Sequence, residues 1–142
     1  MASPNVELVK AGYAALQHAY RTGDLDPLRT HFEAAVDGGF LVKAEGEVFT
    51  EGEWHGPEGL LAFVANQMEA LDAMWIRPEE FIEVDDETIV IPVTFGGRAR
   101  HTEIDVELAP IHLYKLRHGR ALSLRIFNDR AAALAAAGVT AK

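Results

Sequence analysis

Residues 107–119, "ELAPIHLYKLRHG", predict a β-strand that ends in a glycine turn. The strand carries one titratable ring, His112, among mostly apolar neighbours. Because side chains alternate faces along a strand, His112 shares its face with a mainly apolar set. The members of this face are Ile104, Val106, Leu108, Pro110, His112, Tyr114 and Leu116.

Pro110 leaves the register of this strand open. Proline cannot donate a ladder hydrogen bond and often marks an edge or a bulge. With one bulge upstream, Asp105 and Glu107 would turn inward. Without it, the opposite face would present Ile111 and Leu113, whose apolar side chains favour cover by a partner subunit.

The N-terminal half of the chain has mainly helical patterns, and the C-terminal half has mainly extended ones. We predict three helices. The first covers about residues 4–22, the second is shorter and has Asp26 as its N-cap, and the third begins at Pro57 and ends near Asp72. Extended runs follow, separated by turns that include Gly96-Gly97, and a short alanine-rich helix ends near Gly138. This order predicts one α+β domain over residues 1–142.

The composition of the chain excludes several classes of partner and of chemistry. The formal net charge is −9, whereas binding to phosphate-rich partners needs clustered Lys and Arg, so we expect no nucleic acid partner. No apolar run is long enough to span a membrane and no signal peptide is evident, which predicts a cytoplasmic protein without a membrane partner. The chain has no cysteine, so disulfides and thiolate chemistry are excluded.

Four stretches carry a resemblance to a known family: "AYRTGDLDPLRTHF", "EWHGPEGLLAFV", "APIHLYKLRHGRAL" and "RIFNDRAAALAAAG". In this order they resemble the SnoaL-like branch of the nuclear transport factor 2 superfamily, which includes ketosteroid isomerases, limonene epoxide hydrolases and polyketide cyclases. The resemblance implies a cone-shaped α+β barrel, in which a strongly curved antiparallel sheet packs against three helices from the N-terminal half. It also implies an apolar internal pocket and a homodimer, which we assign to the outer face of the sheet.

The resemblance also implies the positions of catalytic residues, and at most of these positions this sequence has a residue that lacks the required chemical group. The isomerase base corresponds to Phe40, its phenol donor to Leu16, and its protonated aspartate to His112. The hydrolase carboxylate corresponds to Arg125. Both of these reactions are disfavoured, while an imidazole can replace the acid/base group of a cyclase.

These patterns lead to a set of site predictions. His112 is the candidate catalytic residue, and its alternative role is that of a buried structural histidine. His101, Glu103 and Asp105 are too widely spaced along one strand for one ion, so we predict no metal site and no cofactor. The predicted substrate-binding residues are Leu16, Tyr20, Phe40, Trp54, Phe63, Gln67 and Tyr114.

Three functions are consistent with this sequence. The first is binding of a small, mostly hydrophobic molecule without a defined reaction. The second is a cofactor-free cyclase or isomerase that uses His112 as acid/base, with help from Asp105 or Glu107 if the strand is bulged. The third is a non-catalytic scaffold whose cone is filled by its own side chains.

Overall fold

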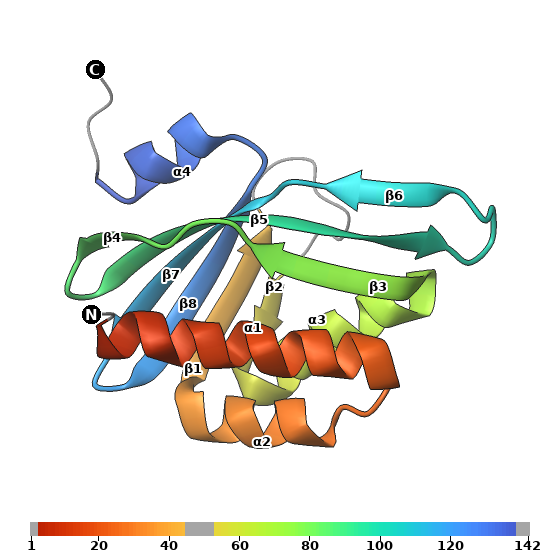
Figure 1. Cartoon of the computed structure of the whole chain (residues 1–142). Coiled ribbons are helices and arrows are strands. Elements are labelled where there is room, and N and C mark those ends of the chain that lie inside the picture. The colour runs from red at the N-terminus through yellow and green to blue at the C-terminus, as the bar shows by residue number, and fades with distance from the viewer. Residues whose placement is uncertain (1–2, 45–52, 139–142) are drawn as a thin grey trace.

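The computed structural model describes residues 3–44 and 53–138 (Figure 1). Helices and strands follow one another in an α+β order. The elements are α1 (Pro4–Thr22), α2 (Asp26–Ala35), β1 (Val36–Ala44), β2 (Glu53–His55), α3 (Gly56–Ala70), β3 (Leu71–Pro78), β4 (Ile82–Asp85), β5 (Thr88–Ala99), β6 (Asp105–Leu108), β7 (Ile111–Arg117), β8 (Arg120–Phe127) and α4 (Arg130–Ala136).

Local signals in the sequence explain where the first two helices begin and end. The Ser3 side chain accepts a hydrogen bond from a backbone amide of the first turn, Pro4 is the first helical residue, and Gly23 ends α1 with φ 76°. The prediction of Asp26 as the N-cap of α2 is wrong. Leu25 is the N-cap and Asp26 is already helical, so its carboxylate lies in the positive first turn.

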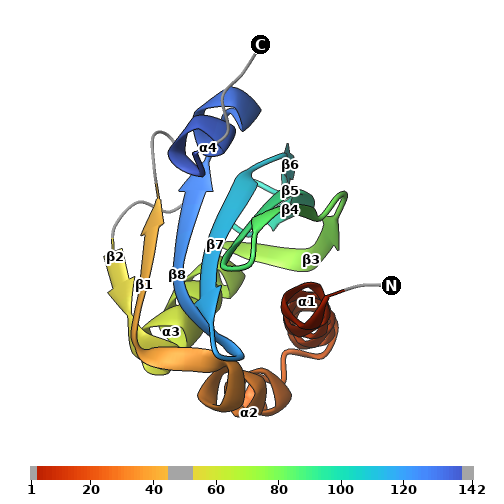
Figure 2. The same cartoon turned by 90° about the vertical axis from the view of Figure 1, so that its left-hand side faces the viewer.

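The sheet is large, strongly curved and mixed. Its main path runs β2-β1-β8-β7-β5-β3, and β4 and β6 also pair with β5. Helices α1, α2 and α3 lie on the concave side, as predicted (Figure 2). The sheet is not purely antiparallel, because β1 pairs with β8 in parallel. This pair joins strands from opposite ends of the chain, and local sequence patterns carry no information on its direction.

The predicted turn at Gly96-Gly97 is wrong, because β5 continues through both glycines. A Cβ added to Gly96 would lie 2.6 Å from the carbonyl oxygen of Val106 and 2.9 Å from the Trp75 ring. Glycine is therefore needed here for the close approach of β3 and β6 to β5, which is the other common reason for glycine inside a strand.

The register at Pro110 is continuous. β6 and β7 pair with β5 in a single register on both sides of Pro110, whose carbonyl oxygen accepts a hydrogen bond from the Val93 amide at 2.9 Å. No bulge reverses the strand, so Asp105 and Glu107 are exposed. His112 points to the helix side, and the suggestion that either carboxylate assists it is wrong.

The outer face near β7 is covered within the chain. Ile111 and Leu113 are buried in a cluster that includes Ala133 and Ala137 at the C-terminal end of the chain. Helix α4 thus lies over the apolar pair to which we assigned the dimer interface (Figure 1). That argument for the interface is wrong, and the homodimer stays a prediction without an assigned face.

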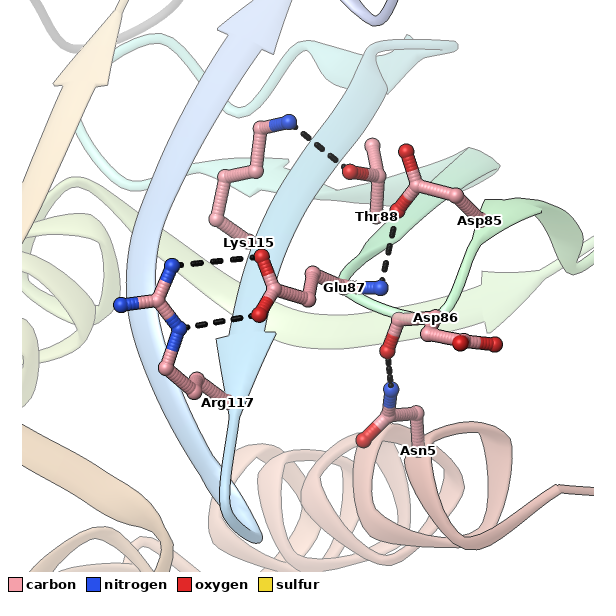
Figure 3. Close-up of polar contacts among 7 residues, drawn as sticks. All are labelled: Asn5, Asp85, Asp86, Glu87, Thr88, Lys115 and Arg117. Carbon is pink, nitrogen blue, oxygen red and sulfur yellow. Dashed lines mark hydrogen bonds and ion pairs between the residues drawn. The ribbon is translucent and has the colours of Figure 1, made fainter.

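Polar contacts join the turn between β4 and β5 to α1 and to β7 (Figure 3). The Asn5 side-chain amide donates to the Asp86 carbonyl oxygen at 2.7 Å. Next to it, the Arg117 guanidinium donates to both carboxylate oxygens of Glu87, at 2.9 and 3.3 Å. The Asn5 bond holds the start of α1 against this turn, the Arg117 bonds hold the turn against β7, and the apolar face of α1 closes one side of the interior.

Among residues 3–44 and 53–138, no helix has the length and apolar composition that crossing a membrane requires.

Candidate functional site

A cavity of about 640 Å³ lies between the concave face of the sheet and helices α1 to α3. Its size is within the range of pockets that hold small organic ligands. Side chains from the three helices and from β1, β3, β5, β6, β7 and β8 line it. Among the described residues, none of the lining side chains belongs to Asp, Glu, Lys or Arg. The cavity is therefore mostly apolar and without formal charge.

His112 and Tyr13 form a polar pair in the wall of this cavity. The Tyr13 hydroxyl lies 2.6 Å from Nδ1 of His112, within hydrogen-bond distance. The two rings are nearly parallel, with an interplanar angle of 15°, and Tyr114 lies edge-on to both. Helix α1 and strand β7 thus each contribute one half of the pair and hold the imidazole in a fixed orientation.

Burial keeps these three rings neutral near pH 7. Desolvation lowers the pKa of His112 from 6.5 to about 4. Burial first, and then the neighbouring Tyr114 phenol, raise the pKa of Tyr13, while burial raises the pKa of Tyr114 to about 12. His112 and Tyr114 keep accessible surface where they line the cavity, so their neutral polar groups can meet a ligand.

The imidazole has one nitrogen left for a ligand. In the described part of the chain, Nδ1 of His112 bonds to Tyr13 and Nε2 has no hydrogen-bond partner. If Tyr13 donates, Nε2 carries the proton and presents a donor to the cavity. If Tyr13 accepts, Nε2 presents a lone pair that can take a proton.

A second polar pair lies farther along α1. The Tyr20 hydroxyl donates to Oε1 of Gln67 on α3 at 3.2 Å. Burial first, and then the neighbouring Tyr114 phenol, raise the pKa of Tyr20, so this hydroxyl also stays neutral near pH 7. Both residues line the cavity.

The structure brings most of the predicted site residues together. Seven of them line the cavity, namely Leu16, Tyr20, Phe40, Phe63, Gln67, His112 and Tyr114.

Trp54 lies outside this lining. Its ring packs edge-on against Phe63 with 5.7 Å between centroids, and its indole Nε1 is buried without a hydrogen-bond partner in the described residues. Phe63 contacts the indole and also lines the cavity, so Trp54 packs against a lining residue without lining the cavity itself.

Tyr13 is the residue that sequence reasoning missed. Its signal was present, because Tyr13 belongs to the apolar stripe of α1 together with Leu16 and Tyr20. The resemblance directed attention to Leu16 as the position of a phenol donor. In the structure the phenol one helical turn earlier reaches His112 instead.

Similarity to known proteins is found in the fold and not in the sequence families. The chain matches no protein-family model. It also matches no curated protein.

Three solved structures illustrate the structural similarity. A nuclear transport factor 2-like protein of unknown function from Burkholderia pseudomallei has a TM-score of 0.73 and 22% identity, with 94% of this chain and 97% of that chain covered. A putative SnoaL-like polyketide cyclase from a Jannaschia species has a TM-score of 0.72 and 19% identity, with 97% and 94% covered. TerC, co-crystallised with polyporic acid, has a TM-score of 0.69 and 23% identity, with 92% and 95% covered. The chain therefore has the nuclear transport factor 2-like fold, shared with SnoaL-like and ketosteroid isomerase-like structures.

Proposed function

We propose that the protein binds a small, mostly apolar molecule in the cavity beneath α1, with His112 and Tyr13 as its polar anchor. The observation that carries the proposal is a cavity of about 640 Å³ whose described lining is apolar apart from a few neutral polar groups. Two proteins of this fold were crystallised with small molecules, TerC with polyporic acid and a protein from Catenulispora acidiphila with trimethylamine, which supports small-molecule binding as a function for this fold.

A cavity-filling variant tests this proposal. Leu16 lines the cavity from α1, whereas Ala14 lies on the exposed side of the same helix. We expect Leu16→Trp to abolish binding of an apolar fluorescent probe, and the matched control Ala14→Trp to leave binding unchanged. Equal binding by both folded variants would contradict the proposed site. Native mass spectrometry of gently purified protein complements this assay by detecting a copurified molecule.

The second candidate function is a cofactor-free reaction in which His112 acts as acid/base. It is favoured by His112 because this residue lines the cavity and its Nε2 has no partner in the described residues. A base requires the tautomer in which Nδ1 carries the proton and Tyr13 accepts. Nitrogen-15 NMR of the imidazole distinguishes the two forms, and a protonated Nε2 at pH 7 would contradict a role as base in the resting protein.

A filled cone was the premise of the scaffold hypothesis. The cavity of about 640 Å³ contradicts that premise, so we do not propose a scaffold function.

A further inference from the structure

Gln67 is an unusual residue for the interior of this protein. Apart from aromatic side chains, Gln67 and Thr88 are the buried polar side chains among the described residues. Thr88 is satisfied, because its hydroxyl accepts a hydrogen bond from the Lys115 ammonium at 2.8 Å (Figure 3). Gln67 is only 9% exposed, and its amide is only half satisfied.

The unsatisfied half of Gln67 is a hydrogen-bond donor. Its Oε1 accepts from Tyr20, and its amide nitrogen has no partner in the part of the chain that the structure describes. Among the described residues, Trp54 Nε1 is the fully buried side-chain polar atom without a partner, so the Gln67 nitrogen keeps accessible surface and can bind a water or a ligand. Because Gln67 lines the cavity, the missing partner has to come from the cavity itself.

We propose that Tyr20 and Gln67 form a second recognition point, at which the Gln67 amide donates to an oxygen acceptor of the bound molecule. The ligand class is then an uncharged, elongated molecule with an apolar middle and a polar group at each end. One end contacts His112 and Tyr13, and the other carries a carbonyl, hydroxyl or ether oxygen that meets Gln67. This inference rests on the proposed binding function and adds the chemistry of the ligand.

The geometry of α1 sets the approximate length of such a molecule. Tyr13 and Tyr20 are two helical turns apart on one face of α1, and both line the cavity. At a rise of 1.5 Å per residue, seven residues separate the two polar points by about 10 Å along the helix. Leu16 lies between them and contributes an apolar surface to the middle.

The charge of the lining selects against ionised ligands. None of the described lining residues is Asp, Glu, Lys or Arg, and His112, Tyr13, Tyr20 and Tyr114 are neutral near pH 7. A carboxylate or an amine bound inside would be buried without an opposite charge, which is strongly unfavourable. A ligand that is uncharged in water meets no such penalty.

Three matched probes test the inference. Each is a biphenyl with a para-hydroxyl on one ring, which can donate or accept at His112. The para position of the other ring carries an acetyl group, an isopropyl group of similar shape, or a carboxylate. Isothermal titration calorimetry at pH 7 with the full-length protein gives the three affinities.

The expected result is a difference that depends on Gln67. In the wild type the acetyl probe should bind several-fold to about tenfold more tightly than the isopropyl probe, which is the effect of one neutral hydrogen bond. In Gln67→Leu, which replaces the amide by an apolar side chain of comparable volume, the two affinities should become equal because either probe then makes one polar contact. The carboxylate probe should bind the wild type most weakly of the three.

Other results separate the failure of this inference from the failure of the proposed function. An acetyl advantage that is missing in the wild type, or that persists in Gln67→Leu, would overturn the second recognition point, as would tight binding of the carboxylate. Failure of all three probes to bind would overturn the apolar binding site itself. Should Gln67→Leu not fold, Gln67→Met replaces it, because the unbranched side chain of methionine fills the same volume.

Discussion

The pH dependence of stability provides a direct test of the buried imidazole. Desolvation lowers the pKa of His112 from 6.5 to about 4 in the folded protein. Between these values the unfolded chain binds a proton that the folded protein does not bind. Stability should therefore rise with pH across this window and be lost as the pH falls from about 6.5 to 4.

The size of the effect follows from the two pKa values. A full shift from 6.5 to about 4 corresponds to about 3 kcal/mol, at 1.36 kcal/mol per unit. Because the ring faces a cavity that can admit water, we take this as an upper bound. Between pH 7 and pH 5, linkage gives a loss of about 2 kcal/mol, which is about 1 M in the midpoint of a urea titration.

The assay compares the wild type with His112→Gln by urea unfolding at pH 7, 6 and 5. Burial also lowers the pKa of His31, and hydrogen bonds lower the pKa of Glu79, Asp85 and Glu87. These groups are present in both proteins and cancel in the difference. The variant should lose about 2 kcal/mol less than the wild type between pH 7 and 5. Equal slopes in the two proteins would refute a neutral, desolvated His112.

Three further predictions concern single contacts. Tyr13→Phe should reduce the free energy of unfolding by about 1 kcal/mol because His112 loses its hydrogen bond, and NMR titration should show a higher pKa of His112 if Tyr13 donates and a lower one if Tyr13 accepts. Gly96→Ala should destabilise by about 1–3 kcal/mol in urea unfolding through overpacking, whereas Gly38→Ala, with open space at its Cβ, should be nearly neutral. Leu113→Ala should cost about 2–5 kcal/mol by thermal unfolding because α4 covers it, and light scattering should show an unchanged oligomeric state; a change of state would contradict this covered position.

Short-range patterns in the sequence predicted the helices and the direction of His112. The capping residues around α1 act within one or two turns, and side-chain alternation acts along one strand, so both can be read from neighbouring letters. A glycine in the sequence does not by itself show whether it forms a turn or permits close packing inside a strand. At His118-Gly119 it forms the predicted turn between β7 and β8, whereas at Gly96 it permits close packing inside a strand.

Long-range contacts were beyond these patterns. The parallel pairing of β1 with β8 depends on the whole topology. The sequence did not predict that α4 covers Ile111 and Leu113, because the buried residue of α4, Ala133, and the buried residue that follows the helix, Ala137, are alanines within an alanine-rich stretch. An alanine-rich helix shows no contrast between a buried and an exposed face, so the sequence could not indicate that the sheet was already covered.

The residue at position 112 supports the proposal that the cavity selects its ligand by shape and hydrogen bonding. Burial raises the pKa of a carboxyl group, so a buried acid changes charge near the pH at which proteins work. Burial moves the pKa of an imidazole in the opposite direction, here to about 4, and the ring remains neutral with one donor and one acceptor. With Tyr13 on one nitrogen, the other stays available at every pH near neutrality. A neutral His112, a half-satisfied Gln67 and a lining without formal charge in the described residues therefore favour an uncharged molecule with polar groups at both ends.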